Sequence, residues 1–325
     1  MSKTIRWGIL STGQIAGDFA QALRFVPDAE LLAVGSRTLD KARQFAQKHN
    51  APRAYGSYEE LAADKDIDII YIGTPHTLHM DDTLLSLRHG KAVLCEKPFS
   101  ISAAQSQRMV DEARQRGLLL MEAMWTRFTP VMCKVRELLA EGTVGPVRSL
   151  LADFSFRKAF DPAGRLFNPV LGGGALLDVG VYVISFAHMV LGEPKDVCGL
   201  MMPTPNGVDY QTGITLGYPG AIASLHCGMS AMTPMEATIA GENGRIRISS
   251  PWFKAKKFSI RRGDKQEDFD LSYESNGLQF QAIEAQRCLR EGLVESPIMP
   301  HADTIAVGRT MDRLRKQWDL RYPGE

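Results

Sequence analysis

Short apolar runs alternate with amphipathic stretches over the first 120 or so residues of the chain. The apolar runs of strand length are residues 5–10, 29–36, 67–73, 92–95 and 118–122. The stretches with apolar side chains at helical spacing are residues 14–25, 41–49, 80–88 and 102–117. Strands linked through helices form a parallel sheet that is covered on both faces. We therefore predict a doubly wound α/β domain over residues 1–123.

The pattern changes after about residue 123. Residues 147–156 read as a long strand, residues 172–191 as a helix that follows three glycines, and residues 196–271 as strands separated by tight turns. Strands joined by tight turns pair antiparallel. We predict a second domain, residues 124–325, of the α+β class, with a large, mainly antiparallel sheet. One face of that sheet packs on helices, and the open face is left for solvent or a partner.

Composition narrows the class of protein. A chain of 325 residues exceeds one ordinary hydrophobic core, which supports two domains. The net charge of +1 gives no electrostatic reason for a nucleic acid partner. We read no apolar run as long enough to cross a membrane, so we expect no membrane partner either.

The cysteines and the N-terminus bear on the compartment. The five cysteines are scattered and show no spacing typical of a disulfide framework or a metal site. No signal-peptide pattern precedes the first strand. We expect a cytoplasmic protein with reduced thiols and no metal.

The loop after the first strand carries a phosphate-binding pattern. The fingerprint G-x-G-x-x-G/A falls on Ser11, Gly13 and Ala16, and Ser11 departs from the usual first glycine. Gly13 leaves room for a pyrophosphate against the backbone, and the next helix offers its N–H groups and its positive end. We predict a Rossmann domain that binds a nicotinamide dinucleotide. The expected contacts in this loop are Ser11, Thr12, Gly13, Gln14 and Ile15.

The tip of the second strand indicates which dinucleotide is bound. Enzymes that use NAD place an acidic residue there, on the ribose hydroxyl. This chain has Ser36-Arg37-Thr38 instead. The planar, cationic side chain of Arg37 suits a 2′-phosphate. We therefore expect NADP(H), with Ser36 and Arg37 among its contacts.

A third loop follows the strand at residues 67–73 and reads Thr74-Pro75-His76-Thr77-Leu78-His79. Ligands of such sheets bind outside the carboxyl ends of the strands, so this loop is expected to line the cofactor. We assign His76 and His79 to capping the next helix or to the ribose, in preference to acid–base chemistry. The expected contacts are Thr74, Pro75, His76 and His79.

Three motifs carry a family resemblance. The strand at residues 92–95 ends in Glu96-Lys97-Pro98, residues 122–128 read EAMWTRF, and residues 172–182 read GGGALLDVGVY. Together with the dinucleotide fold, they resemble the Gfo/Idh/MocA oxidoreductase family over essentially the whole chain. The most similar branch contains dimeric dihydrodiol dehydrogenase and the NADP-dependent D-xylose dehydrogenases. The resemblance implies hydride transfer between nicotinamide and a CH–OH group of an aldose, at C1, or of a cyclic trans-diol.

The resemblance also implies roles for single residues. Lys97 maps to a lysine beside the nicotinamide, and Tyr182 maps to an acid–base tyrosine, a position where family members often have histidine. Oxidation of an alcohol needs a group that takes the hydroxyl proton, and a nearby ammonium favours the phenolate. Either Tyr182 transfers this proton, tuned by Lys97, or Lys97 transfers it itself. Asp178 lies four residues before Tyr182 and shares its face if the segment is helical.

The same resemblance, together with the chemistry of the motifs, points to further site residues. Aromatic rings that suit a sugar or diol are implied at Trp125, Phe154 and Phe280. Glu96, Trp125 and Arg127 are expected near the cofactor. Gly172, Gly173 and Gly174 would let the backbone approach substrate or cofactor closely. A cis bond between Lys97 and Pro98 would aim the lysine inward.

Two other functions share this fold. A dinucleotide-sensing regulator needs no reactive lysine, so Lys97, Asp178 and Tyr182 together favour an enzyme. The family's NAD-dependent glycosidases are expected to carry a histidine in the glycine motif and to prefer NAD, which Arg37 opposes. We expect a homodimer formed through the open face of the C-terminal sheet.

Overall fold

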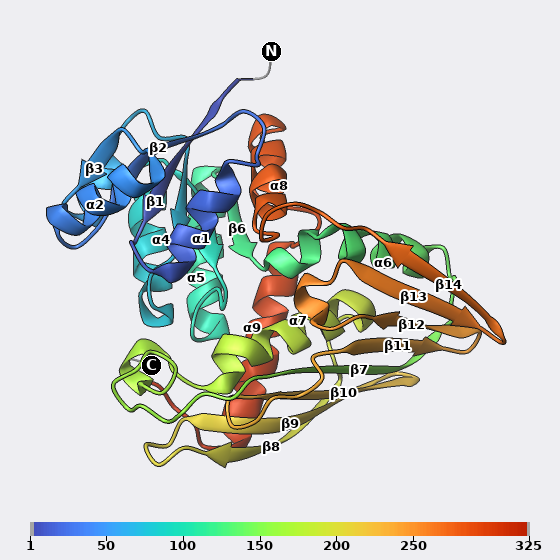
Figure 1. Cartoon of the computed structure of the whole chain (residues 1–325). Helices are drawn as coiled ribbons and strands as arrows, with labels where there is room; N and C mark the ends of the chain where they lie inside the picture. The colour runs from blue at the N-terminus through green and yellow to red at the C-terminus, as the bar shows by residue number, and fades with distance from the viewer. Residues whose placement is uncertain (1–2, 324–325) are drawn as a thin grey trace. The chain divides into compact units, whose positions relative to one another are not determined.

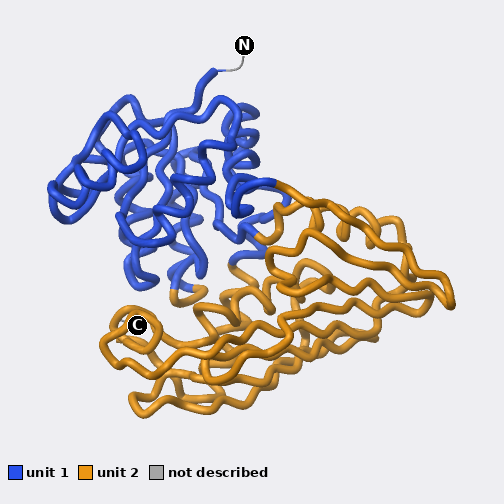
Figure 2. Tube along the Cα trace, in the orientation of Figure 1, with its two compact units in different colours: residues 1–100, 104–125, 274–304 blue, residues 101–103, 126–273, 305–325 orange. Residues whose placement is uncertain are grey.

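The computed structural model describes residues 3–323, which form two compact units (Figures 1 and 2). Unit 1 comprises Met1–Ser100, Ala104–Trp125 and Glu274–Thr304, and unit 2 comprises Ile101–Ala103, Thr126–Tyr273 and Ile305–Glu325. The predicted boundary near residue 123 lies close to the change from unit 1 to the long central segment of unit 2, which begins at Thr126. The split into 1–123 and 124–325 nevertheless misses residues 274–304, which return to unit 1.

Unit 1 is built on a parallel sheet of six strands in the order β3-β2-β1-β4-β5-β6. The strands are β1 (Ile5–Leu10), β2 (Ala29–Gly35), β3 (Arg53–Tyr55), β4 (Ile69–Ile72), β5 (Ala92–Glu96) and β6 (Leu120–Ala123). The helices are α1 (Gln14–Leu23), α2 (Leu39–His49), α3 (Tyr58–Ala63), η1 (His76–Leu78), α4 (His79–Arg88), α5 (Ala103–Arg116) and α8 (Gln279–Arg290). The predicted doubly wound α/β domain is confirmed.

The core of unit 1 explains this arrangement. All four residues of β4 and all five of β5 are buried, as expected of central strands with helices on both faces. The rings of Phe19 and Tyr71 stack with centroids 3.8 Å apart, and Trp7 packs beside Phe19. Helix α8 packs on α1, and the side-chain amide of Asn276 donates to the carbonyl oxygen of Asp18 at 2.9 Å. That long-range contact accounts for the return of residues 274–304.

Unit 2 is built on a sheet of eight strands in the order β14-β13-β12-β11-β7-β10-β9-β8. Only β7 and β10 pair parallel within it, so the predicted mainly antiparallel sheet is confirmed. The first four strands are β7 (Val147–Ser155), β8 (Asp196–Pro203), β9 (Asp209–Tyr218) and β10 (Ala221–Gly228). The others are β11 (Ala237–Gly241), β12 (Gly244–Ile248), β13 (Lys257–Arg262) and β14 (Lys265–Asp270).

The helices of unit 2 cover one face of this sheet. They are α6 (Pro130–Ala140), the short η3 (Pro169–Leu171) and η5 (Trp252–Lys254), a π-helical turn η4 (Leu176–Gly180), α7 (Val181–Leu191) and most of α9 (His301–Gln317). The single turn η2 (Trp125–Phe128) spans the point in the chain at which the unit 1 segment ends, at Trp125, and the unit 2 segment begins, at Thr126. Alternation is clear in β10, where Ala223 and Leu225 are buried and Ile222 is exposed.

One helical segment corrects the prediction about apolar runs. Pro169–Leu191 is long and apolar enough to cross a membrane by length and composition. However, 89% of its apolar window is buried inside the fold, as in the core helix of a globular domain. It packs on β7 and β10 of the unit 2 sheet.

Candidate functional site

The loops predicted to bind the dinucleotide leave the carboxyl ends of the parallel strands in unit 1. Ser11 follows β1, Ser36 follows β2, Thr74 follows shortly after β4, and Lys97 follows β5. Because all six strands run the same way, these loops share one edge of the sheet. The strand order reverses between β1 and β4, which is where open α/β sheets form their ligand crevice.

The loop after β1 fits a dinucleotide phosphate. Ser11 has φ of +118°, a conformation that favours glycine, and its hydroxyl accepts from the N–H of Gly13 at 3.2 Å. Gly13 is exposed at the start of α1. A Cβ there would meet nothing closer than the Ser11 hydroxyl, at 3.6 Å. The first turn of α1 holds no acidic residue, so its positive end is available to an anion.

The tip of β2 carries a cation and no acid. Ser36 is buried, and the following Arg37 is exposed. The positive charge of Arg37 acts on Tyr58 of α3, where it opposes the rise in pKa that burial gives that phenol. The arrangement fits the predicted 2′-phosphate contact.

His79 connects two of the loops at this edge. Its side chain has no exposed surface, and its ring nitrogens lie 2.7 Å from the carbonyl oxygen of Pro98 and 2.9 Å from that of Thr74. His79 thus joins the Thr74 loop to the Lys97 loop at the start of α4, and its place among the cofactor contacts stays a prediction. His76 is also buried and meets the edge of the His79 ring.

A buried carboxyl group lies behind the same loop. The hydroxyl of Thr74 donates to Asp82 at 2.7 Å. Burial raises the pKa of Asp82 to about 6, although the Thr74 hydroxyl acts in the opposite direction. Pro75 is partly exposed beside them.

Lys97 is held by its neighbours in unit 1. The Glu96 carboxylate is buried, accepts from the Tyr71 hydroxyl at 2.7 Å, and accepts from the backbone N–H of Lys97 at 3.1 Å. Glu96 thus fixes the lysine backbone from inside the sheet, and its predicted place near the cofactor stays a prediction. The Lys97–Pro98 peptide bond is cis, which confirms that prediction.

In unit 2, the helical start that carries Asp178 and Tyr182 is partly π-helical. Asp178 lies in η4 and Tyr182 in the first turn of α7, and both residues are buried. A π turn holds about one residue more than an α turn and is frequent at functional sites. The guanidinium of Arg165 donates to the Asp178 carboxylate at 3.1 Å. No pattern in the sequence indicated Arg165, because an irregular loop separates it from Asp178.

Three aromatic rings gather beside this helix start. Phe154 of β7 lies 5.2 Å from Tyr182 between ring centroids, and it stacks on Phe253 at 4.0 Å with an interplanar angle of 6°. The structure thus brings two predicted site residues together, Phe154 and Tyr182, and the role of Phe154 toward a substrate stays a prediction. Phe253 was missed, since it lies in the irregular turn η5, where side-chain periodicity indicates no direction.

Arg127 is anchored to the helix that carries Tyr182. Its side chain is 3% exposed and donates to both the hydroxyl and the carbonyl oxygen of Ser185 on α7, each at 3.1 Å. Its predicted contact with the dinucleotide stays a prediction. Trp125 and Phe280 both belong to unit 1, where Trp125 is 8% exposed and Phe280 is half-buried on α8. Lys97 and Tyr182 belong to different units, so their pairing stays a prediction.

Known proteins match this chain along its whole length. Residues 5–124 match the model of an oxidoreductase family with an NAD-binding Rossmann fold, Gfo/Idh/MocA, and residues 132–247 match the C-terminal domain of that family. The chain belongs to the Gfo/Idh/MocA oxidoreductase family. It is therefore a dehydrogenase or reductase with an NAD(P)-binding Rossmann domain, acting on CH–OH type substrates.

Individual members of the Gfo/Idh/MocA family show how similar the chain is. Trans-1,2-dihydrobenzene-1,2-diol dehydrogenase is 40% identical in Xenopus tropicalis and 37% identical in Bos taurus. The matches cover 98% of this chain and 99% and 98% of those proteins. A 3-ketoreductase from Actinomadura kijaniata, solved with NADP and TDP-benzene, is 28% identical with a TM-score of 0.85, covering 97% of this chain and 98% of that one. An aldose-aldose oxidoreductase from Caulobacter crescentus, 24% identical, shares the fold with a TM-score of 0.88 over 98% of both chains.

The three glycines of the Gfo/Idh/MocA motif in this chain serve its own packing. A Cβ on Gly173 would lie 2.8 to 2.9 Å from backbone atoms of Leu166 and Asn168, and one on Gly174 would lie 2.1 Å from the Asp209 carboxylate. Gly172 has φ of +73°. Protein atoms therefore occupy the space beside Gly173 and Gly174 where a side chain would stand, and close approach of substrate or cofactor to this backbone stays a prediction.

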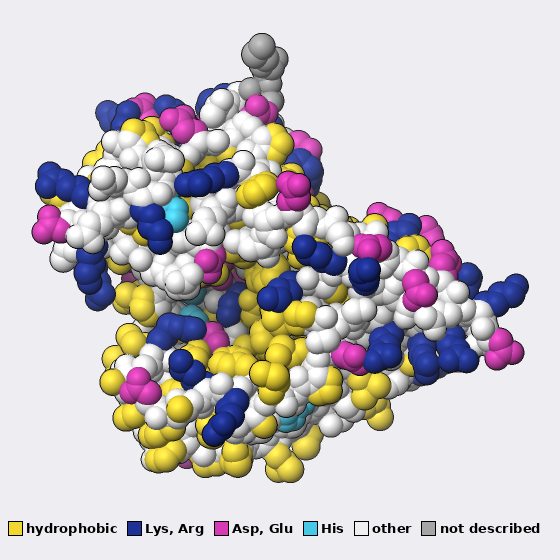
Figure 3. Space-filling view, viewed as in Figure 1, with side chains coloured by type: hydrophobic (Ala, Val, Ile, Leu, Met, Phe, Trp, Pro, Cys, Tyr) yellow, Lys and Arg dark blue, Asp and Glu magenta, His cyan; other side chains and the backbone are white. Residues whose placement is uncertain are grey.

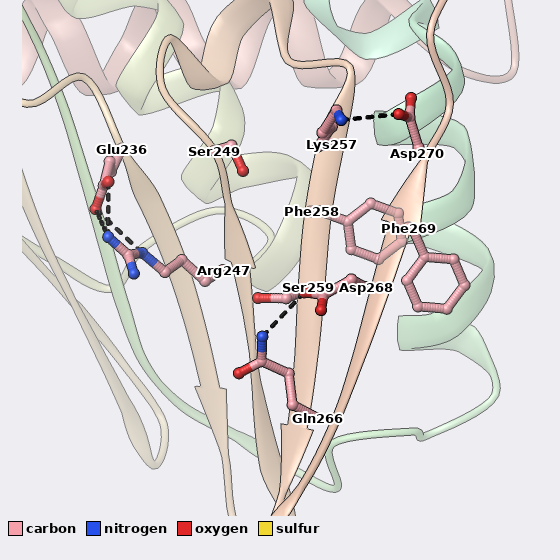
Figure 4. A pocket seen from close by; sticks show the side chains of 10 residues that line it. All are labelled: Glu236, Arg247, Ser249, Lys257, Phe258, Ser259, Gln266, Asp268, Phe269 and Asp270. Atoms are coloured by element: carbon pink, nitrogen blue, oxygen red, sulfur yellow. Dashed lines mark hydrogen bonds and ion pairs between the residues drawn. The ribbon is translucent and has the colours of Figure 1, made fainter.

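Unit 2 has a second polar region, whose charged side chains pair with one another and offer no group for catalysis or cofactor binding. A shallow pocket of about 460 Å³ lies over β11 to β14 (Figure 4). Its charges pair with one another, Arg247 with Glu236 and Lys257 with Asp270. Among residues 3–323, no cluster of three or more His, Cys, Asp or Glu side chains could hold a metal ion.

Proposed function

We propose that this protein is an NADP-dependent oxidoreductase that moves a hydride between nicotinamide and a CH–OH carbon of an aldose, at C1, or of a cyclic trans-diol. The observation that carries the proposal is the placement of Lys97 on the same strand edge as the Ser11–Gly13 loop. A reactive lysine at the mouth of a dinucleotide site has a use in an enzyme and none in a sensor. The names of the relatives at 37–40% identity support a diol or sugar substrate.

The chain's own residues would divide the work as follows. The Ser11–Ile15 loop and the start of α1 would hold the pyrophosphate, and the bound cofactor would supply the hydride carrier. Tyr182 would take the hydroxyl proton while the Lys97 ammonium stabilises the charge that develops on the substrate oxygen. In the alternative, Lys97 transfers the proton. Phe154 and Phe253 would pack against the apolar face of the substrate ring.

Cofactor preference rests on Arg37. The guanidinium would pair with the 2′-phosphate that distinguishes NADP from NAD. Arg37→Ala should therefore lower kcat/KM for NADP much more than for NAD. Arg43, which is also exposed, lies on α2, and Arg43→Ala should change kcat/KM for neither cofactor. Equal losses with the two cofactors would remove this role from Arg37.

We also propose a homodimer through the outer face of the unit 2 sheet. Leu200 is 82% exposed there, Ile222 55% and Leu151 49%, and apolar side chains gather along the β8–β10 side of the surface (Figure 3). The β13–β14 hairpin is charged instead, with exposed Arg261, Arg262 and Lys265. A contiguous apolar area of this kind is typical of an interface. Leu200→Glu with Ile222→Glu should give a monomer in sedimentation; an unchanged mass would contradict this interface.

The thiols support a reducing compartment. Cys95, Cys227 and Cys288 are buried, and all five cysteines are free. We therefore propose that the protein acts in the cytoplasm. Fractionation of cells that express it would test this, and recovery in an oxidising compartment would contradict it.

The decisive experiment for the activity is a substrate panel. NADP⁺ and NAD⁺ reduction should be followed with aldoses and cyclic trans-diols, in parallel with titration of NADPH binding. The proposal expects turnover with NADP⁺ and at least one of these classes. Tight NADPH binding without turnover on any substrate would favour the regulatory function, and turnover of glycosides with retained NAD would favour the glycosidase branch.

A further inference from the structure

The helix start that carries Asp178 and Tyr182 lacks a cap of its own. Ala175 precedes η4, and its methyl side chain cannot accept the N–H groups that a helix leaves unpaired at its first turn. Those N–H groups are buried, because residues 175–178 are all more than 90% enclosed. A buried helix start needs an acceptor from elsewhere in the fold.

Asp209, the first residue of β9, supplies that acceptor from 33 residues further along the chain. Its side chain has no exposed surface, and Oδ2 accepts from the N–H of Leu176 at 2.5 Å. The backbone N–H of Ala175 also acts on this carboxylate. A negative charge at the positive end of a helix is favourable as well.

The glycine loop is shaped to admit this carboxylate. A Cβ on Gly174 would come within 2.1 Å of Oδ1 of Asp209, and Gly174 has φ of +119°. The Tyr322 hydroxyl lies near the same position, 3.0 Å from it, and donates to the carbonyl oxygen of Gly173 at 2.7 Å. The Arg315 guanidinium lies over the Tyr322 ring, 5.4 Å from its centroid. Two side chains from distant segments thus fix residues 173–176.

We propose that Asp209 is a positioning residue, which sets where Asp178 and Tyr182 stand by capping their helix, with Tyr322 holding the preceding loop. This rests on the proposed function, in which Tyr182 takes the substrate proton. Asp178 is two residues beyond the capped N–H and Tyr182 is six, so a shift of the cap moves both. Misplacement of a reacting group by about 1 Å can cost about 100-fold in rate.

The protonation state of Asp209 predicts how the activity depends on pH. Burial raises the pKa of Asp209 to about 6, although the backbone N–H groups from which it accepts and the positive charge of Arg315 both lower it. The groups that face it are Arg315 of α9, the Tyr322 hydroxyl, and the Cys227 thiol of β10, whose own pKa burial raises well above its usual value. A carboxylate accepts N–H groups more strongly than a neutral carboxyl group. Activity should therefore fall on the acid side as Asp209 takes up a proton.

Asp209→Asn in the full-length protein is the test, because the amide keeps one acceptor oxygen at the same size. We expect kcat at pH 7.5 to fall about 10-fold, the decline of kcat near pH 6 to disappear, and KM for NADP to stay within about twofold. Asp209→Ala, with no acceptor, should lose about 100-fold. Hydrogen exchange of residues 175–182 should speed up at least 10-fold in both variants.

Asp153→Asn is the matched control. Its carboxylate also accepts two backbone N–H groups in unit 2, those of Met235 and Glu236, at 2.7 and 3.2 Å, but it caps no helix. This variant should keep the decline of kcat near pH 6 and the wild-type exchange of residues 175–182. If Asp209→Asn behaves like Asp153→Asn in both measurements, the proposal is overturned.

Tyr322→Phe covers the case in which the Asp209 variants fail to fold. Loss of one hydroxyl should speed exchange of residues 172–178 several-fold and lower kcat about threefold to tenfold, since a hydrogen bond contributes on the order of 1 kcal/mol. Unchanged exchange and unchanged kcat would overturn the proposal. If the wild-type protein turns over no substrate in the panel, the proposed function fails, and the exchange rates still decide whether Asp209 holds this helix start.

Discussion

The two units each present a glycine-bearing loop at the start of a helix, and the two loops differ in what occupies the space beside the glycine. In unit 1, a Cβ on Gly13 would point into open space beside the Ser11 hydroxyl. In unit 2, a Cβ on Gly174 would collide with the Asp209 carboxylate. Glycine at the first position leaves room for a ligand, and glycine at the second leaves room for the protein itself.

The two units also hold their reacting groups, Lys97 and Tyr182, in different ways. Unit 1 places Lys97 through short-range contacts, since Glu96 adjoins it in sequence and Tyr71 lies on the neighbouring strand. Unit 2 places Tyr182 through groups that come from far along the chain, Asp209 and Tyr322. The first unit can therefore bind its cofactor with loops that are local, whereas the second depends on a network that closes only when β9 and the C-terminal segment have packed.

The largest effects are expected at the two reacting groups, one from each unit. Lys97→Met and Tyr182→Phe should each lower kcat by about 10²–10⁴-fold, the range for general acid–base groups. Steady-state rates with the best substrate of the panel measure this. Lys158→Met and Tyr210→Phe change the same residue types in the loop and strand of unit 2 and should keep kcat within about twofold. A near-normal kcat in Tyr182→Phe would leave Lys97 as the group that transfers the proton.

The contrast between the units also explains which features could be predicted from the sequence. The strand at residues 5–10 and the cofactor loop were recognisable because a strand, a turn and a helix follow one another within a few residues, and Lys97 was recognisable through the family resemblance of its motif. Asp209 and Phe253 were not, since their contacts join segments whose register is set only by packing. Arg127 shows the same limit. It stands in a motif beside Trp125, yet its guanidinium turns to Ser185 on α7, which no spacing in the sequence indicates.

The next largest effect should separate the two glycines by stability. Gly174→Ala combines a collision at 2.1 Å with φ of +119°, so we expect a loss of about 3 kcal/mol or more in the free energy of unfolding. Gly192→Ala is the control for the backbone term alone, because Gly192 has φ of +79° and no neighbouring atom within 4 Å of its Cβ position. Thermal unfolding measures both. Equal losses would mean that the Asp209 contact contributes nothing beyond the strained backbone.

Gly13→Ala should show the opposite pattern. Its melting temperature should stay within about 2 °C of the wild type, because the new methyl group meets no protein atom closer than 3.6 Å. Affinity for NADPH should fall about 10- to 100-fold, since one methyl group in a filled site costs about 1–3 kcal/mol. Titration of NADPH, by fluorescence or calorimetry, measures this. Unchanged affinity would show that the pyrophosphate does not lie against Gly13.

The smallest effect is expected at Asp82, the buried carboxyl group of unit 1 and the counterpart there of Asp209. Burial raises its pKa from an ordinary value near 4 to about 6 in the folded protein. The stability that this group contributes is therefore fully present below about pH 4 and is lost as pH rises through about 6. Asp82→Asn keeps an acceptor for the Thr74 hydroxyl and has no charge to bury.

The difference in melting temperature between Asp82→Asn and the wild type should consequently grow in favour of the variant between pH 5 and pH 8, by a few degrees. Thermal unfolding at several pH values measures it, with Asp40→Asn, at an exposed carboxylate in the first turn of α2, as the control. In unit 2, the melting temperature of Asp209→Asn should gain less on the wild type over the same pH range. The Asp209 carboxylate caps a helix, so removing its charge weakens that cap, whereas the Asp82 carboxylate caps nothing comparable. A flat difference at Asp82 would mean that the Thr74 loop accommodates the charged carboxylate without penalty, and the parallel between the two buried acids would then fail.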